Sequence, residues 1–336
     1  MRNFKLFIIL LLGITISLSA CSNESKNIVK PDNEKEMNES EENKTKDEEE
    51  SDTEDKQNAP SVQIEMEGQV TYEDHTLTVE GKTNLLPDSN VFVYPQAFGS
   101  ASFIGVSGSA TVEQDGTFLY ETKVPEEYNY GLFVDIRFRP EDATNESVKE
   151  FYGEYGENIE GPMTSLYESD EKVRKQALTE VYLPVKNGEA VTKEIETPEW
   201  QVPDDYGDPN VRMDANVTYD DQLIYIKGES NLLEGSELML TLLSPEGSLT
   251  GVGGRANVKP DGSFFTVLDR DSYEEELNNH TFRVTFAPSE YSWETIRNNY
   301  GDQGEKITGE HLKEKLNDQE AELLIDLGGE KANVVE

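Results

Sequence analysis

The chain has few cysteine and histidine side chains, the types most often used to hold a transition metal or to activate a nucleophile. Its 336 residues include one cysteine and three histidines, which are His75, His280 and His311. A single cysteine excludes an internal disulfide framework and a cysteine-based zinc site. No histidine lies four residues from another, and a lone histidine is more often an ordinary surface or core residue than a ligand. Cysteine and histidine chemistry therefore indicates no active site.

The one cysteine is informative because of the residues before it. The chain begins MRNFKLFIILLLGITISLSAC, with two basic residues and then an apolar run that ends at about Leu18. This order is typical of an export signal, and the run is too short for a comfortable membrane span. The tetrad Leu18-Ser19-Ala20-Cys21 resembles the lipobox of bacterial lipoproteins. The resemblance implies cleavage between Ala20 and Cys21 and a diacylglycerol on the Cys21 thiol. A plain secretory signal is the alternative.

The residues after the cysteine predict a disordered tether. Residues 22–60 are rich in Glu, Asp, Lys, Asn and Ser and have almost no aromatic or branched apolar side chains. Such a segment cannot bury enough apolar surface to offset the entropy lost on ordering. With two or more acyl chains on Cys21, the chain is expected to stay anchored at the outer face of a membrane.

The charge of the chain narrows the possible partners. It has 29 basic and 69 acidic residues and a formal net charge of −40. This surface repels polyphosphate, so we expect no direct binding to nucleic acid or to an anionic membrane face. The sequence contains no G-x-G-x-x-G, P-loop, HExxH or G-x-S-x-G motif, and we expect no catalytic residues and no cofactor. Paired carboxylates for glycoside hydrolysis carry no information in a chain this acidic.

A group of aspartates is the only candidate for a metal site. Asp204, Asp205 and Asp208 precede the second of two repeats described below. Calcium takes six to eight oxygen ligands, and carboxylates between tandem domains can bind it. The spacing fits no EF-hand loop, so a solvated linker is the alternative and calcium is an unlikely ligand.

A long internal repeat is the strongest signal in the sequence. Residues 70–89, VTYEDHTLTVEGKTNLLPDS, align with residues 217–236, VTYDDQLIYIKGESNLLEGS, and nine of the 20 positions are identical. The match continues in VEQDGTFLY from Val112 and VKPDGSFFT from Val258, and in LFVDIRFRP and TFRVTFAP. Each copy spans about 130 residues, the size of a whole domain and not of a solenoid unit.

Within each copy the apolar residues recur at every second position. One stretch alternates an apolar face with a mixed face, namely Leu132, Val134, Ile136 and Phe138 against Phe133, Asp135, Arg137 and Arg139. This period is typical of antiparallel strands half-buried in a sandwich. The Asp-Gly pairs at 115–116 and 261–262 predict hairpin turns, because glycine supplies the positive φ. In the repeated Asn-Leu-Leu phrase, we expect asparagine to bond its own backbone and a leucine to close the end of the sandwich.

Each copy also contains a segment, before its closing strand, in which apolar residues recur at helical spacing. Residues 145–156 and 289–301 both end in Tyr-Gly, which is a helix C-cap signal. Residues 169–177 and 308–318 predict a second helix in each copy, with Ser169 and Thr308 as N-caps. These insertions are either functional decorations or lids over an open end of the core.

Together these features predict a mainly β protein made of two tandem immunoglobulin-like sandwiches without the disulfide. We expect a signal peptide at 1–20, the lipidated cysteine and tether at 21–60, a first repeat at 61–195, a linker at 196–210 and a second repeat at 211–330. The layout resembles that of Gram-positive surface lipoproteins, and the resemblance implies no particular activity.

The predicted function is non-enzymatic binding or adaptor activity at the cell surface, with a protein or cell-wall partner. An enzyme or accessory domain acting on cell-wall polymer and a passive spacer are the alternatives. An enzyme should hold clustered acids of shifted pKa in a cleft of one copy only. Any function is expected where the two copies differ, because the shared phrases are those that the core and turns require.

Overall fold

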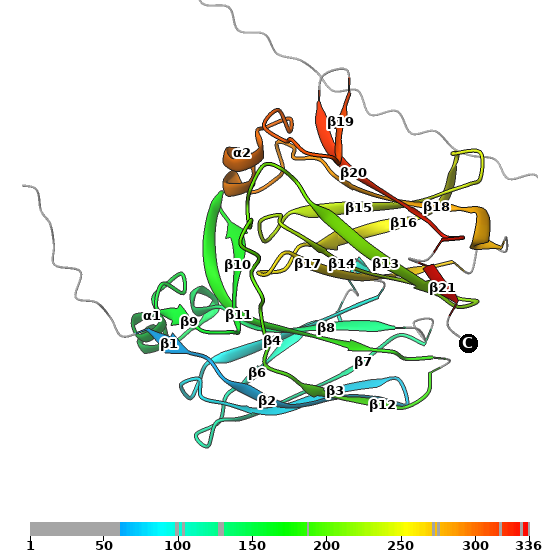
Figure 1. The fold of residues 1–336 in the computed structure, drawn as a ribbon. Coiled ribbons are helices and arrows are strands. Elements are labelled where there is room, and N and C mark those ends of the chain that lie inside the picture. The colour runs from blue at the N-terminus through cyan, green and yellow to red at the C-terminus, as the bar shows by residue number, and fades with distance from the viewer. Residues whose placement is uncertain are drawn as a thin grey trace, which may run out of the picture. The chain divides into compact units, whose positions relative to one another are not determined.

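The alternating residues of the first repeat form two sheets (Figure 1). One sheet has the strand order β12-β2-β3-β7 and the other β10-β11-β8-β4-β5, with β6 also paired to β4. The first sheet contains β2 (Met66–Glu73), β3 (Thr76–Thr83), β7 (Thr117–Lys123) and β12 (Val191–Ile195). The second contains β4 (Asn90–Ala97), β5 (Ala101–Ser102), β6 (Gly108–Thr111), β8 (Leu132–Phe138), β10 (Thr164–Ser169) and β11 (Lys172–Leu183). Strands β1 (Val62–Gln63) and β9 (Ile159–Glu160) form a separate parallel pair.

The second repeat forms two sheets of corresponding order, β17-β14-β13-β21 and β16-β15-β18-β20-β19. The first contains β13 (Met213–Tyr219), β14 (Leu223–Ser230), β17 (Ser263–Asp269) and β21 (Ala332–Val334), which pairs parallel to β13. The second contains β15 (Glu237–Leu243), β16 (Leu249–Asn257), β18 (Thr281–Phe286), β19 (Leu312–Glu314) and β20 (Gln319–Asp326).

The structure is a computed structural model. It describes residues 61–97, 101–102, 105–126, 131–186, 188–270, 273, 276–315, 318–329 and 332–334. The predicted signal peptide, Ala20, Cys21 and the tether lie outside these described residues. No helix among those described is long and apolar enough to cross a membrane.

Both repeats have the strand order of an immunoglobulin-like sandwich, which confirms the predicted fold class. In one sheet, β2, β3 and β7 correspond to strands A, B and E of an immunoglobulin domain. In the other, β6, β4, β8 and β11 correspond to strands C′, C, F and G. The second repeat gives the same pairs from β13 to β20. One core gathers residues between Ile64 and Ile195, and a second gathers residues between Val211 and Leu327.

The repeated Asn-Leu-Leu phrase makes the same contacts in both copies. Leu85 and Leu232 are buried, as predicted. Asparagine does not bond its own backbone, however. The Asn84 side chain accepts from the Glu65 amide at 2.9 Å, and the Asn231 side chain accepts from the Arg212 amide at 2.8 Å. The repeated asparagine therefore fastens the turn to the segment that enters the sandwich 19 residues earlier.

A helix is present in each of the two predicted stretches, 145–156 and 289–301. The second ends at Tyr300-Gly301 as predicted, but the first ends at Tyr152-Gly153, three residues before the predicted Tyr155-Gly156. Helices α1 (Glu146–Tyr152) and α2 (Glu294–Tyr300) each end before a glycine with positive φ. The Tyr152 hydroxyl accepts from the Leu86 amide at 2.9 Å, and the Tyr300 hydroxyl accepts from the Leu233 amide at 3.1 Å. Each helix thus closes one end of its sandwich by bonding the Asn-Leu-Leu turn, which supports the lid interpretation.

The second helix predicted in each copy is wrong. Residues 169–177 lie in the antiparallel pair β10–β11, whose turn places Asp170 and Glu171 at φ 51° and 60°. Residues 308–318 contribute β19, which pairs with β20. Hydrogen bonding to a neighbouring strand overrides the local helical spacing, and the pattern within a short stretch of sequence does not reveal that neighbour.

The Asp-Gly turns are also not hairpins. Gly116 and Gly262 do have positive φ, 84° and 80°. The strands on either side belong to different sheets, however, because β6 and β7 pair with β4 and β3, while β16 and β17 pair with β15 and β14. Each turn therefore carries the chain across the sandwich from one sheet to the other. Two short strand-like runs around Asp-Gly predict a turn but do not identify the pairing partners.

Candidate functional site

Side chains from the outer faces of two sheets join the repeats. Phe133 on β8 and Val267 on β17 are buried, and they cluster with Leu223. The rings of Phe133 and Phe265 lie 5.5 Å apart, and those of Tyr182 and Phe265 lie 5.4 Å apart. Aromatic contacts at these distances stabilise beyond their buried area. The repeats therefore share an apolar seam, and the described residues of both repeats belong to one compact unit.

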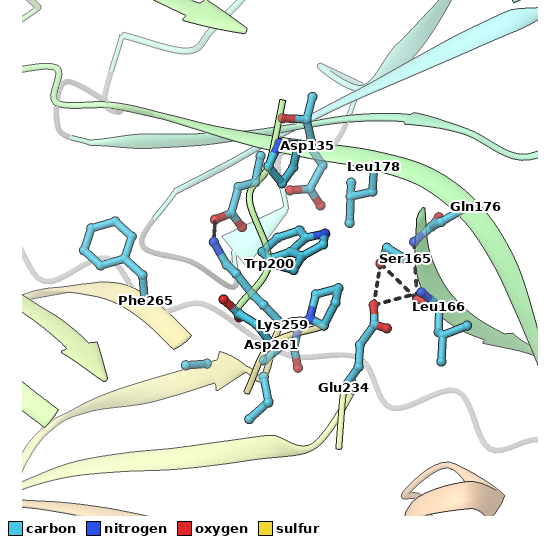
Figure 2. Close-up of a pocket in the computed structure, with 18 of the residues that line it drawn as sticks. Asp135, Ser165, Leu166, Gln176, Leu178, Trp200, Glu234, Lys259, Asp261 and Phe265 are labelled. Carbon is cyan, nitrogen blue, oxygen red and sulfur yellow. Dashed lines mark hydrogen bonds and ion pairs between the residues drawn. The ribbon is translucent and has the colours of Figure 1, made fainter. Parts of the chain in front are cut away.

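A cleft of about 910 Å³ lies beside this seam and takes side chains from both repeats and from the segment between them. We call it the inter-repeat cleft (Figure 2). Its lining includes Phe133, Asp135, Ser165, Glu180, Trp200, Glu234, Lys259, Asp261, Phe265 and Trp293. The volume lies within the range of small-molecule binding sites.

Two carboxylates stand opposite each other in the cleft. Asp135 on β8 is the direct cross-strand partner of Glu180 on β11, and like charges in that register repel. Lys259 of the second repeat meets Glu180 at 2.9 Å, and Gln96 donates to Asp135 at 3.2 Å. Burial raises the pKa of Asp135 to about 7, and the charge of Glu180 adds to the rise. Asp135 therefore changes charge near neutral pH.

Glu234 fixes the second repeat against the first. One of its carboxylate oxygens accepts from the Ser165 hydroxyl at 2.6 Å and from the Leu166 amide at 2.8 Å. The backbone amide of Glu234 donates to the Tyr206 hydroxyl at 2.8 Å. Burial raises the pKa of Glu234, and the two hydrogen bonds oppose that rise. Pro87 is the aligned residue of the first repeat, so this contact is specific to one copy.

Both tryptophans of the chain line the cleft. Trp200 lies near the centre of the view in Figure 2, and its indole N–H donates to the Pro162 carbonyl at 2.6 Å. The Trp293 ring packs on Gly235, where an added Cβ would collide with it. One tryptophan comes from the inter-repeat segment and the other from the residue that precedes α2. The cleft is therefore built where the copies differ.

The segment predicted as a linker is tied to both repeats. The Thr179 hydroxyl donates to the Glu196 carbonyl at 3.1 Å, and Asn299 donates to the Gly207 carbonyl at 2.7 Å. The Gly207 amide donates to the Asn231 carbonyl at 2.6 Å. These bonds position Trp200 in the cleft.

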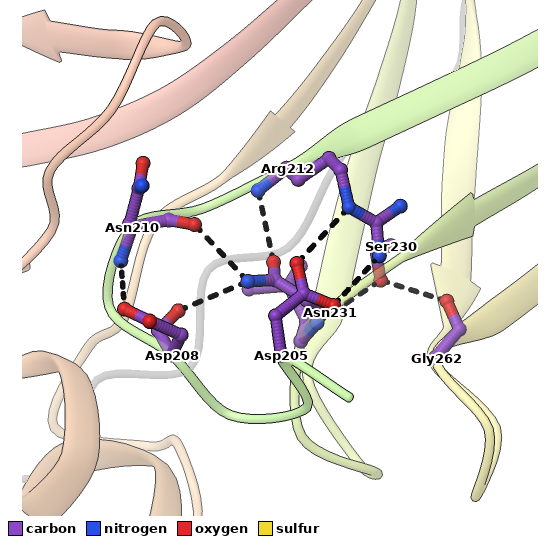
Figure 3. Close-up of polar contacts among 8 residues, drawn as sticks. Asp205, Asp208, Asn210, Arg212, Ser230, Asn231 and Gly262 are labelled. Atoms are coloured by element: carbon purple, nitrogen blue, oxygen red, sulfur yellow. Dashed lines mark hydrogen bonds and ion pairs between the residues drawn. The ribbon is translucent and has the colours of Figure 1, made fainter. Parts of the chain in front are cut away.

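Two of the three aspartates considered for calcium, Asp205 and Asp208, have other contacts (Figure 3). Asp205 forms two hydrogen bonds with Arg212, at 2.9 and 3.1 Å, and this pairing lowers the pKa of Asp205. Asp208 accepts from the Asn210 amide at 2.8 Å, as in an Asx turn. Across the described ranges, no group of three or more His, Cys, Asp or Glu side chains is placed to hold a metal ion. Calcium binding by Asp204, Asp205 and Asp208 stays the unlikely alternative to a solvated linker, and it would require Asp205 to leave Arg212.

Comparison with known proteins assigns the chain to no family. No family model matches the chain. No curated protein matches it either.

Sequence reasoning did not find the inter-repeat cleft. Periodicity predicts only that Asp135 and Phe133 lie on the mixed face of their strand, and the prolines around Trp200 predict a linker. The available signal was Phe133 itself, an aromatic side chain on an otherwise polar face.

Proposed function

We propose that the protein is a lipid-anchored, extracytoplasmic binding module and that the inter-repeat cleft is its ligand site. The observation that carries this proposal is the cleft itself, which contains both tryptophans of the chain and acids of raised pKa. Perturbed pKa values and aromatic side chains in one concave site are typical of functional sites. The partner is a protein or cell-wall polymer exposed at the membrane surface.

The anchor is tested by Cys21→Ala. We expect the wild-type chain in the membrane fraction and the variant in the soluble fraction or the medium, because the variant lacks the thiol that would carry the lipid. Fractionation followed by immunoblotting measures the distribution. Retention of the variant in the membrane fraction would show that the lipobox interpretation is wrong.

The cleft is tested by sedimentation of the full chain with purified cell-wall sacculi. We expect Trp200→Ala to weaken the affinity for the sacculi at least tenfold, about 1.4 kcal/mol of binding free energy. Tyr291→Ala serves as the control, because Tyr291 is 86% exposed and outside the cleft. Equal binding by wild type and Trp200→Ala, or no binding by either, would contradict the proposal for wall polymer.

Acid–base hydrolysis of a wall polymer is a second candidate. Asp135 occurs in one copy only, since Arg283 is the aligned residue of the second repeat, and its pKa suits proton transfer at neutral pH. Binding is favoured because Glu180 is paired with Lys259 and Glu234 accepts two hydrogen bonds, so both acids have structural partners. Release of soluble fragments from the sacculi by wild type, and none by Asp135→Asn, would favour hydrolysis instead.

A further inference from the structure

We propose that the inter-repeat cleft selects a ligand that carries an alkylammonium group, such as a lysine side chain, and that Asp135 is the counter-ion of this group. The inference rests on the proposed use of the cleft for binding. It adds the chemical class of the ligand, which follows from how charge and aromatic surface are arranged there.

The cleft has an excess of negative charge. Its lining contains the acids Asp135, Glu180, Glu196, Glu199, Glu234 and Asp261 and the bases Arg255 and Lys259. Three of these acids are already engaged: Glu180 by Lys259, Glu234 by Ser165 and the Leu166 amide, and Asp261 by the Ser263 amide. The hydrogen bond that Asp135 accepts comes from a neutral amide, that of Gln96. A second ammonium beside Asp135 would relieve its repulsion by Glu180.

The aromatic side chains favour an organic cation over a metal ion. Trp200, Trp293, Phe133 and Phe265 line the same cleft. An ammonium over a tryptophan ring gains cation–π attraction, and its alkyl stem gains from apolar contact. Calcium and magnesium need six or more ligands, mostly oxygens, and no group of three or more His, Cys, Asp or Glu side chains in the described residues is placed to hold a metal ion.

The charged groups around Asp135 set the expected pH dependence. Burial comes first in raising the pKa of Asp135 to about 7, followed by Glu180, while Arg137, Lys259 and Arg139 oppose the rise. Tyr94 and Gln96 on β4 are its uncharged neighbours on the other side. A bound ammonium favours the carboxylate, so binding releases a proton below pH 7. Affinity should therefore rise with pH through the neutral range and level off above it.

The two tryptophans make the test direct, because both line the cleft and tryptophan fluorescence, excited selectively over the tyrosines, therefore reports on it. The full-length chain in uncharged detergent is titrated with Nα-acetyl-lysine methylamide at constant ionic strength. The matched probe is the same compound acetylated on Nε, which keeps the shape and removes the charge. We expect the charged probe to bind at least tenfold more tightly at pH 8. We also expect its affinity to fall about tenfold between pH 8 and pH 6, as a carboxyl with a pKa near 7 predicts.

Variants assign the effect to Asp135. Asp135→Asn should bind the charged probe at least tenfold more weakly at pH 8 and show no pH dependence. Glu146→Gln is the control, because that acid is outside the cleft and its side chain is 79% exposed. Equal affinity for the two probes, an unchanged Asp135→Asn variant or no fluorescence response to the charged probe would overturn the inference. If the sacculi still sediment wild type and not Trp200→Ala, the cleft remains the binding site and only the ligand class is wrong.

Discussion

Replacing Gly262 by alanine is expected to lower the free energy of unfolding by about 3 kcal/mol, against about 1 kcal/mol for the same change at Gly247. Both glycines have a positive φ, 80° and 79°, so both variants lose the same backbone freedom. A Cβ at Gly262 would lie well inside van der Waals contact with the Ser230 carbonyl oxygen, whereas nothing lies within 4 Å of one at Gly247. The difference between the two losses of unfolding free energy therefore measures the cost of a Cβ where the turn approaches β14.

Urea denaturation followed by tryptophan fluorescence measures both variants. We expect the midpoint to fall further for Gly262→Ala while the slope with denaturant stays unchanged. The Gly262 amide also donates to the Lys259 carbonyl at 2.9 Å, so the turn is fixed from both sides. Equal losses for the two variants would show that the backbone conformation alone, and not the contact with Ser230, makes glycine necessary.

Replacing Phe133 by alanine is expected to lower the free energy of unfolding by about 3 to 4 kcal/mol, although Phe133 belongs to neither sandwich core. Its ring is 2% exposed and contacts Tyr182 of its own repeat at 4.9 Å and Phe265 of the second repeat at 5.5 Å. Truncation leaves a cavity in the seam between the repeats, because the two sheets cannot close over it without moving as bodies.

Leu119→Ala is the matched control for this prediction. Leu119 lies on β7 of the same repeat and is 62% exposed, so its truncation should change stability by less than about 0.5 kcal/mol. The measurement is again urea denaturation of the full chain. A loss at Phe133 no larger than that at Leu119 would mean that the seam does not contribute to stability and that the repeats are held by Glu234 and the inter-repeat segment.

The sequence alone determined the repeat, the sandwich class, the buried leucine of each Asn-Leu-Leu phrase and the presence of a helix in each of the stretches 145–156 and 289–301. These features depend on local preference or on a period of two, and both are visible in a short window. Comparing the two repeats also distinguished the positions that the fold requires, which are identical in both, from positions that differ between them. The lipobox at Cys21 stays a prediction, because it lies outside the described residues.

The tertiary structure decided which strands pair and which outer faces meet. Residues 169–177 have helical spacing, but they form the β10–β11 turn and the start of β11, because β10 pairs with them. The Asp-Gly turns look like hairpins, but their strands pair with partners far away in the chain. Phe133, Asp135 and Trp200 come from a mixed strand face and a proline-rich segment, and only the packing of one repeat on the other brings them into one cleft. Pairing and packing depend on contacts between residues distant in sequence, which neither propensity nor periodicity contains.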